Sequence, residues 1–562
     1  MKDIRIYCEN TDEHHNVQFG KTLKDIASEI CPEHNAIAAL VDNCLKGLDF
    51  IVLEQHNIRF INYDHPDGRR TYIRSLCFVL QNAVNELYPD KVLAVDYSLP
   101  SGLYCEIREK NNHEDGRPNV YLITDDEIAR LKDKMAEIIS RDLPFQREKI
   151  SFEEAEKLFT AKYQTEKVHL LNSLKRFTYS VYFLDGKADT FYGPLAPSTG
   201  ILTTFDLMGF NEGFCLQYPM DGCPGKVLPM KRQSKIATAL KEHSDWCSIM
   251  GVRGVGALNK TVLEGNIRHL INLSEALHER KYADIADQIY SRRGTVKIVF
   301  IAGPSSSGKT STSKRLAIQC RILGMNPKVI ELDNYFVDRE LTPRDKNGEY
   351  DFEALEAMDL KFLGEQLNDL LAGKEVEIPK FDFKEGKRIF NGNRMQLHDK
   401  DILIMEGIHA LNPAMIPDVD NSKVFRVYAS ALTSLSIDEN NNISTSDNRM
   451  LRRMIRDNRT RGVNPEETIM RWQSVRRGEN HNIFPFQEFA DAVFNSAHIF
   501  ELPVLKYYAE PLLRRIAPSS PAYTEAVRML KFLSYIITLS PSEISAIPPT
   551  SILREFIDGQ TL

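Results

Sequence analysis

The sequence predicts an α/β protein of several domains, with a doubly wound parallel sheet in its C-terminal part. Three observations lead to this prediction. The chain has 562 residues, and a length prior of roughly 100–200 residues per domain suggests three or four domains. Its content of 42% hydrophobic and 27% charged residues is ordinary for a globular protein. From residue 296 onward, short β-rich apolar runs alternate with helical patterns.

The composition also limits the expected partners and location. The net charge of −7 gives no general attraction to nucleic acid, so such binding would need a local basic patch. We find no apolar run long enough for a membrane helix and no signal-peptide pattern at the start, so neither a membrane span nor export is expected. Nine cysteines without a C-x-x-C pair indicate reduced thiols and a cytoplasmic protein. We expect a homo-oligomer.

The clearest motif is a phosphate-binding loop at residues 303–310, which fits the pattern G-x-x-x-x-G-K-S/T. An apolar run at 296–301 predicts a strand before it, and a helix is predicted from Lys309 to about Cys320. The N–H groups of such a loop and of the helix start bind phosphate. Lys309 would reach the β- and γ-phosphates of ATP, and the alternative is a Ser/Gly-rich surface loop. The predicted nucleotide-binding residues are Gly303, Ser305, Ser306, Ser307, Gly308, Lys309, Thr310 and Ser311.

Two acidic residues follow predicted strands near this loop. A strand at 328–332 ends beside Asp333, and a strand at 401–405 ends beside Glu406. The carboxyl ends of parallel strands line the ligand crevice of a doubly wound sheet. We therefore predict that Thr310, Glu406 and Asp333 hold Mg²⁺. Either acid could instead cap a helix.

The N-terminal 62 residues contain β-like runs at 4–7, 36–41, 50–53 and 58–62 and one helix-like segment at 22–30. This order resembles the TGS module, a β-grasp domain of threonyl-tRNA synthetases. Residues 63–227 resemble the second additional, editing-type domain of threonyl- and alanyl-tRNA synthetases, on segments 72–89, 102–107 and 193–200. In place of that family's H-x-x-x-H and later histidine, this chain has Arg74, Phe78 and Leu195. We predict a scaffold or binding role rather than metal binding or deacylation.

Residues 228–293 are predicted as a helical connector, because apolar residues recur there at spacings of three and four. Gly251, Gly254 and Gly256 interrupt the pattern. We interpret these glycines as a loop that could approach a ligand in the neighbouring domain.

Five segments between residues 303 and 407 occur in the order typical of one kinase family. They are residues 303–310, 333–336, 350–359, 379–383 and 406–407. The chain from 296 to 513 therefore resembles the uridine kinase and phosphoribulokinase family, and residues 294–562 are predicted as a P-loop kinase domain with a C-terminal extension. The resemblance implies ATP and Mg²⁺ as cofactors and a small-molecule hydroxyl acceptor.

The resemblance also implies roles for single residues. Asp333 would accept the proton of the attacking hydroxyl, and Lys309, Arg456 and Arg461 would hold the transferring group. Arg453, on a basic lid helix at 452–462, would join the nucleotide site. Arg449, Arg452 and Arg459 are as readily interpreted as solvated charges on the helix surface as phosphate contacts, and RNA binding by this helix is the alternative. The acceptor would contact Asp333, Tyr335, Glu353, Phe381, Asp382 and Arg388.

Two departures from the family concern the acceptor. Uridine kinases carry Tyr and His where this chain has Phe381 and Gly386, so a pyrimidine base would lose hydrogen bonds worth on the order of 1–3 kcal/mol per unpaired group.

The sequence predicts an ATP-dependent kinase acting on a hydroxyl of a nucleoside or related sugar or polyol, with the N-terminal half as a binding or regulatory module. The alternative is a nucleotide-dependent regulator or RNA-associated protein that uses ATP as a switch.

Overall fold

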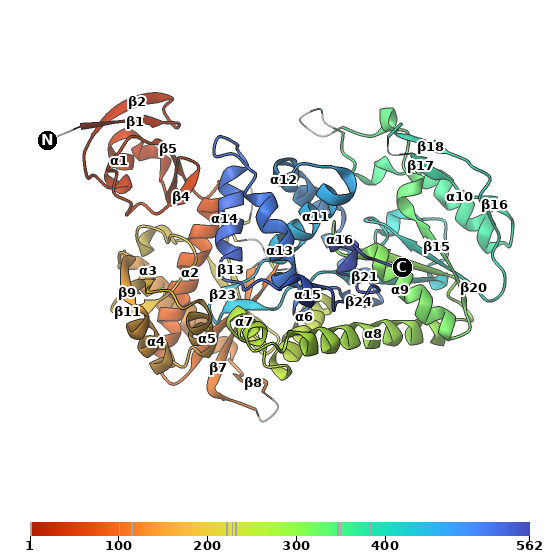
Figure 1. The fold of residues 1–562 in the computed structure, drawn as a ribbon, viewed down its shortest axis with the longest axis horizontal. Coiled ribbons are helices and arrows are strands. Elements are labelled where there is room, and N and C mark those ends of the chain that lie inside the picture. The colour runs from red at the N-terminus through yellow and green to blue at the C-terminus, as the bar shows by residue number, and fades with distance from the viewer. Residues whose placement is uncertain are drawn as a thin grey trace.

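The computed structural model describes residues 3–100, 102–113, 116–220, 223–227, 229–230, 233–344, 348, 350–382 and 384–562. Figure 1 shows a small β-rich body at the N-terminus, a mixed body below it, a helical connector along the lower edge and a sheet-containing body at the opposite end. The last part of the chain, drawn in blue, returns between these ends. Within the described ranges no helix has the length and apolar character needed to cross a membrane.

The first body has the β-grasp arrangement. Its strands pair in the order β2-β1-β5-β3-β4, and β1 and β5 are parallel. Helix α1 begins after Thr22, which forms a capping box with Asp25. The elements are β1 (Asp3–Cys8), β2 (Glu13–Gln18), α1 (Leu23–Ile30), β3 (Ala38–Val41), β4 (Cys44–Lys46) and β5 (Asn57–Ile61).

Some short elements of this body differ from the prediction. Strands β2 and β4 are not predicted, because β2 is polar and buries only Val17 of its six residues. The strand predicted at 50–53 is wrong. That segment makes one isolated bridge, between Ile51 and Thr22, and the side chains of Ile51 and Leu53 are half exposed. A short apolar run in a loop can therefore have the same sequence pattern as a strand.

The second body combines a long buried helix with two antiparallel sheets. Helix α2 (Pro66–Leu87) packs on α3 and β6 and buries Leu76, Phe78 and Leu80. One sheet has the order β12-β13-β7-β6, with β8 beside β7, and the other has the order β11-β10-β9. The other elements are β6 (Val92–Leu99), β7 (Gly102–Asn112), β8 (Pro118–Tyr121), α3 (Asp125–Ser140), β9 (Gln146–Ser151), α4 (Phe152–Ala161), α5 (Thr165–Leu174), β10 (Thr178–Leu184), β11 (Lys187–Asp189), β12 (Asp206–Phe210) and β13 (Gly213–Gln217).

The connector is helical, with α6 (Ser234–Ile249), α7 (Val255–Leu263) and α8 (Ile267–Ser291). The interpretation of its glycines as one loop holds only in part. Gly251 lies in the loop with a φ of +67°, but Gly256 lies inside α7. A Cβ at Gly256 would approach the Leu170 nitrogen of α5 to 2.2 Å, so this glycine permits close helix packing and does not approach a ligand.

The sheet of the C-terminal body is parallel and is covered by helices on both faces, as predicted. Its strand order is β15-β20-β14-β21-β24. One face packs on α8 and α9, and the other packs on α10 and α6. The elements are β14 (Ile298–Ala302), α9 (Lys309–Ile322), β15 (Asn326–Glu331), α10 (Leu360–Leu371), β16 (Val376–Glu377), β17 (Lys380–Asp382), β18 (Lys387–Ile389), β19 (Arg394–Met395), β20 (Asp401–Glu406), β21 (Val424–Ser430), β22 (Ser436–Asp438), β23 (Asn441–Asn442), α11 (Thr445–Arg461), α12 (Pro465–Asn482), β24 (Ala492–Asn495) and α13 (Glu501–Leu513).

The hairpin of β22 and β23 joins the C-terminal body to the second body through buried polar groups. Asp438 accepts a hydrogen bond from the Tyr192 hydroxyl and lies 3.9 Å from the Lys167 amine. Asn440 donates to Asp189 at 2.7 Å, and Asp189 forms an ion pair with Lys167. Without the second body, the buried Asp438 would lose both Tyr192 and Lys167, and a buried charge left without its partner costs several kcal/mol. The two bodies therefore form one structural unit.

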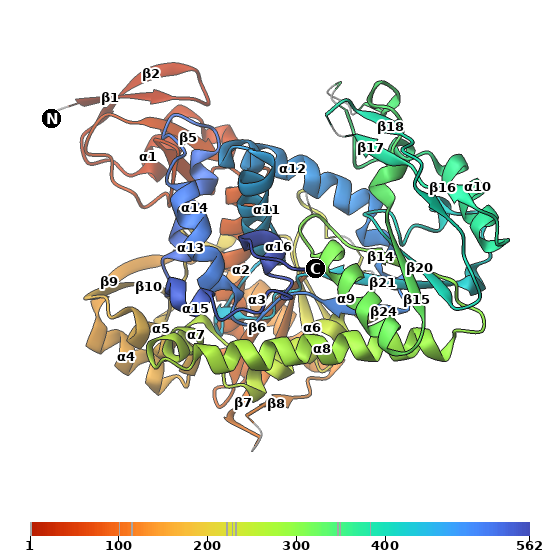
Figure 2. The ribbon, with the colours of Figure 1, turned by 45° about the vertical axis from the view of Figure 1, so that its right-hand side comes forward.

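The C-terminal extension connects the two ends of the molecule. It contains α14 (Tyr523–Leu533), α15 (Pro541–Ile544) and α16 (Arg554–Ile557). In α14, the Thr524 hydroxyl donates to the Asn43 carbonyl at 2.8 Å, and Glu525 pairs with Arg70 at 2.9 Å. Its apolar side chains share a core with α11 and α13. Figure 2 shows α14 between the β-grasp body and α11.

Candidate nucleotide and acceptor site

The predicted phosphate-binding loop lies between β14 and α9. It runs close to β21, because a Cβ at Gly303 would lie 1.9 Å from the Ala429 carbonyl oxygen. Gly308 has a φ of +81°, which favours glycine. Ser306 has a φ of +59°, a conformation that is uncommon outside glycine and is often found at functional sites. The backbone has the tight turn that a phosphate site needs.

Thr310 and Glu406 meet at the carboxyl ends of two neighbouring strands. The Thr310 hydroxyl donates to Glu406 Oε1 at 2.5 Å. Burial raises the pKa of Glu406 to about 7, although Lys309 and the Thr310 hydroxyl act in the opposite direction. Oxygen ligands of this kind fit Mg²⁺, which uses one or two protein oxygens and completes its shell with phosphate and water. Lys309 is half buried and its amine lies 3.4 Å from the Pro304 carbonyl.

Asp333 lies after β15 at the same edge of the sheet. It is accessible to solvent, but the surrounding protein removes it partly from bulk water and raises the pKa of its carboxyl. Lys309, Arg461 and Arg456 lower this pKa through their charges, which puts all three near Asp333. A carboxylate and three cations thus lie close enough for their charges to act on one another.

Glu353 is the second acid on the acceptor side. Burial, together with the charge of Glu479, raises the pKa of Glu353 to about 7. The Asn482 amide of α12 donates to the Glu353 carbonyl at 2.7 Å, so α12 holds this loop. The charges of Arg453 and Lys309 lower the pKa of Glu353, and Lys309 also acts on Asp333 and Glu406. Glu353 thus lies close enough to the phosphate loop for the charge of Lys309 to act on its pKa.

The lid helix α11 presents three arginines around one buried acid that the sequence analysis missed. Arg453 donates to the Ser305 hydroxyl at 2.9 Å, which joins the lid to the phosphate loop. Asp457 is buried and pairs with Arg453 at 3.2 Å, with Arg456 at 3.0 Å and with Arg461 at 3.4 Å. The spacing of four residues from Arg453 to Asp457 and from Asp457 to Arg461 was a signal that could have identified it.

The interpretation of the neighbouring arginines as solvated charges is wrong for two of them. Arg449 and Arg452 are almost fully buried. Arg449 pairs with Glu479 of α12 at 2.8 Å, and Arg452 pairs with Glu501 of α13. Because α11 packs between these helices, its basic residues on that side need acidic partners. Arg459 is exposed and donates to the C-terminal extension.

The remaining acceptor residues do not all face the crevice. Tyr335 is fully buried and its hydroxyl donates to Gln366 at 2.9 Å, so the prediction that it contacts the acceptor is wrong. The Asp382 carboxylate accepts two backbone N–H groups of the β17–β18 turn, and Arg388 pairs with Asp359 at 2.8 Å. Phe381 is buried with its ring against Phe336. Phe383, from the 379–383 motif, lies outside the described residues.

Two parts of the chain are similar to known proteins. Residues 298–501 match the model of the Phosphoribulokinase / Uridine kinase family. Residues 298–501 thus form a domain of this family. A uridine kinase from Macrococcus caseolyticus is 29% identical over 197 residues, which are 35% of this chain and 86% of that protein. The solved structure of a possible uridine kinase from Bacillus stearothermophilus has a TM-score of 0.27 and 20% identity, and the match covers 38% of this chain and 98% of that one.

The N-terminal region is similar to threonine–tRNA ligases. The ligase from Rubrobacter xylanophilus is 32% identical over 190 residues, which are 34% of this chain. The chain spans only 28% of the length of that relative. The similarity therefore concerns a part of those enzymes, fused here to a kinase-family domain.

The editing-site positions of this region are filled by packed side chains. Arg74 is partly buried, packs against Gly193 and donates to the Pro194 carbonyl at 2.8 Å. Phe78 contacts the rings of Phe145 and Phe191. Leu195 is buried in the same apolar core. Among the described residues, no cluster of three or more His, Cys, Asp or Glu could hold a metal ion.

We expect the purified protein to contain no stoichiometric zinc and to leave a mischarged tRNA intact. The physical reason is that Arg74, Phe78 and Leu195 offer no imidazole, and that Phe78 and Leu195 fill their positions with buried apolar side chains. Metal analysis by mass spectrometry and a deacylation assay test this. One equivalent of tightly bound zinc, or hydrolysis of the charged tRNA, would contradict it.

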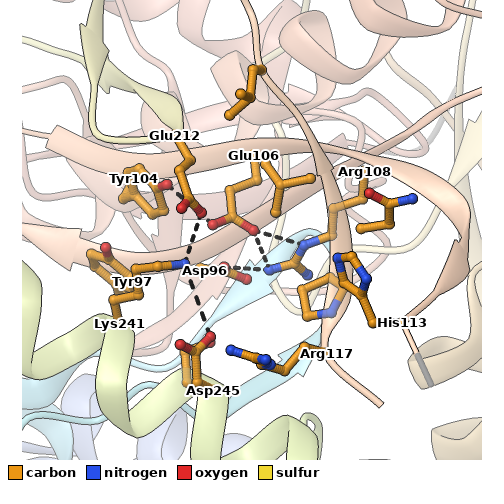
Figure 3. A pocket seen from close by; sticks show the side chains of 15 residues that line it. Asp96, Tyr97, Tyr104, Glu106, Arg108, His113, Arg117, Glu212, Lys241 and Asp245 are labelled. Atoms are coloured by element: carbon orange, nitrogen blue, oxygen red, sulfur yellow. Dashed lines mark hydrogen bonds and ion pairs between the residues drawn. The ribbon is translucent and has the colours of Figure 1, made fainter. Parts of the chain in front are cut away.

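A separate polar cavity of about 720 Å³ lies between β6, β7 and α6, and Figure 3 shows its side chains. Arg108 pairs with Glu106 at 2.8 Å and also with Asp96, while Lys241 pairs with Glu212 at 2.8 Å. These charges largely neutralise one another. The cavity is distinct from the phosphate loop and adds no group to that site.

Proposed function

We propose that this protein is an ATP- and Mg²⁺-dependent kinase that phosphorylates a hydroxyl of a nucleoside or a related sugar or polyol. One observation carries the proposal. The phosphate loop, the Thr310–Glu406 contact, Asp333 and the Asp457-centred lid arginines lie together in a kinase-family domain, since Arg453 contacts the loop and the charges of Arg456 and Arg461 act on Asp333. A simple anion-binding loop would need neither the acids nor the lid.

In this mechanism the Asp333 carboxylate takes the proton of the acceptor hydroxyl. The hydroxyl oxygen bonds to the γ-phosphorus of ATP, and the bond from that phosphorus to the bridging oxygen breaks, which releases ADP. Lys309, Arg456 and Arg461 neutralise the charge of the transferred group. When bound, Mg²⁺ supplies further neutralisation at the phosphate oxygens. Thr310 and Glu406 are the residues that would hold it.

We propose that the N-terminal half acts as a binding or regulatory module. Its buried contacts with the β22–β23 hairpin, and the contacts of Asn43 and Arg70 with α14, support a structural connection to the kinase body. We propose domain limits of 1–62, 63–227, 228–293 and 294–562. A cytoplasmic location and a homo-oligomeric state are part of the same proposal.

The test is a screen of nucleosides, pentoses and polyols for acceptor-dependent ADP release, with product phosphorylation followed by mass spectrometry. Pyrimidine nucleosides should be poor acceptors. Phe381 offers no hydroxyl, and Gly386, with a φ of +68° and Arg339 against it, leaves no place for an imidazole. ADP release that no acceptor changes would instead favour a nucleotide switch.

Replacing Glu406 by glutamine should lower Mg²⁺-dependent turnover by roughly 10² or more, because a charged oxygen beside Thr310 is lost. The same variant should be more stable at high pH. The pKa of Glu406 is raised to about 7 in the folded protein and is about 4.3 in the unfolded chain. The folded state therefore has its full stability below about pH 4.3 and loses stability as the pH rises through about 7, because the carboxyl must then ionise at a buried site. Glutamine escapes this loss, worth on the order of 1–3 kcal/mol.

Melting temperatures of Glu406→Gln and of the wild type between pH 4 and pH 8 check this prediction. The difference should grow with pH and vanish near pH 4. Glu264→Gln, which removes an exposed acid at the end of α7, is the matched control and should show no such trend. Full turnover by Glu406→Gln would remove Glu406 from the magnesium site.

A further inference from the structure

A segment of the C-terminal extension lies against the start of helix α9. Glu555, in α16, accepts the backbone N–H of Ser311 at 3.2 Å and the Ser311 hydroxyl at 2.5 Å, both on Oε2. Figures 1 and 2 show α16 next to α9, although α16 lies far from the phosphate loop in the sequence. The segment 548–562 has no motif in the sequence, and the proposed reaction does not use it.

The Ser311 N–H is one of the donors that a phosphate site needs. Ser311 is the third residue of α9, and the first helical bond starts one residue later, from the Thr312 N–H to the Gly308 carbonyl at 2.9 Å. The N–H groups before that point have no acceptor inside the helix. In a phosphate-binding loop these N–H groups cradle the phosphates of the nucleotide. In this structure the Glu555 carboxylate accepts the hydrogen bond of the Ser311 N–H.

Further contacts hold the segment across the loop. The Gln560 amide donates to the Ser311 hydroxyl at 2.7 Å. Ile552 covers Gly308, since a Cβ at that glycine would lie 2.4 Å from the Ile552 Cδ1 atom. Arg459 of the lid helix donates to the Glu555 carbonyl at 3.0 Å. The segment thus bridges the phosphate loop and the lid.

The charge of Glu555 also reaches the magnesium side of the site. Burial is the main cause that raises the pKa of Glu406, and the charges of Asp333 and Glu555 add to it. A nucleotide phosphate at Ser311 would bring another negative charge beside Glu555, and like charges at this distance repel. Glu555 and a phosphate cannot share the Ser311 N–H.

We propose that Glu555 is an autoinhibitory contact, in which its carboxylate occupies a phosphate position of the nucleotide site and has to leave before ATP binds fully. This proposal rests on the nucleotide site of the proposed function. The extension that carries Glu555 also contacts Asn43 and Arg70 through α14. The N-terminal half is therefore connected to the segment that covers the phosphate loop.

The test compares binding of a non-hydrolysable ATP analogue with Mg²⁺ to the full chain by calorimetry. Glu555→Gln should bind about tenfold or more tightly than the wild type, because a charged competitor becomes a neutral one. Glu543→Gln is the control. It removes a charge from the same extension, where Glu543 caps its own helix α15, and its Kd should stay unchanged. An unchanged or weaker affinity of Glu555→Gln would overturn the proposal.

A second measurement uses the unmodified protein and does not depend on how well a variant folds. Hydrogen exchange of residues 553–558 should become faster when the analogue binds, and unchanged or slower exchange would overturn the proposal. Lys309→Ala separates the two hypotheses. If it abolishes analogue binding while Glu555→Gln changes nothing, only the autoinhibitory contact is wrong. If neither Glu555→Gln nor the wild type binds the analogue, the nucleotide site itself is wrong.

Discussion

Replacing Lys309 by alanine should abolish measurable turnover, with a fall in kcat/KM of at least roughly 10²–10³. The Lys309 amine is the cation of the phosphate loop, and its charge also acts on Asp333, Glu353 and Glu406. The fold should persist, because the amine makes a weak contact of 3.4 Å to the Pro304 carbonyl. Acceptor-dependent ADP release and a melting curve measure both effects.

Lys400→Ala provides the comparison for this variant. Lys400 is an exposed cation in the loop before β20, so its removal changes the net charge equally without touching the phosphate loop. It should keep full turnover. Wild-type activity of the Lys309→Ala variant would contradict the assignment of the phosphate loop.

Replacing Asp333 by asparagine should lower kcat by roughly 10²–10⁴ while nucleotide affinity is retained. The asparagine keeps the size of the side chain but cannot take the proton of the acceptor hydroxyl. The location of Asp333 near Lys309, Arg456 and Arg461 favours a role where charge develops during transfer. Single-turnover rates and the Kd of an ATP analogue separate the chemical step from binding.

A different pattern would assign Asp333 another role. If Asp333→Asn loses Mg²⁺–ATP affinity and the residual kcat is unchanged, the carboxylate belongs to the metal and not to the acceptor. Asp399→Asn, an exposed acid on the same body, should change neither quantity.

Local sequence patterns determined the parts of the site that depend on neighbouring residues. The spacing from Gly303 to Thr310, between an apolar run and a helical segment, is enough to predict the phosphate loop, because the turn and the helix start need those residues at those positions. Asp333 and Glu406 could be predicted because each lies at the carboxyl end of a strand, and neighbouring parallel strands end at one edge of the sheet.

The failures have a common physical cause, which is that burial and ion pairing depend on residues distant in the chain. Arg449 and Arg452 look like surface charges until α12 and α13 supply Glu479 and Glu501. Tyr335 looks like an acceptor contact until α10 supplies Gln366 as the partner of its hydroxyl. No local pattern reports such partners.

The sequence by itself determined the class of the fold, the phosphate loop, the strand-end acids and the absence of imidazoles at Arg74, Phe78 and Leu195, since these follow from residue type and short spacing. Only the tertiary structure decided that Asp457 gathers the lid arginines and that Glu555 lies on the Ser311 N–H, across 244 positions of the chain. Such long-range contacts arise when separate helices bury their apolar faces in one core, and that packing is a property of the whole chain.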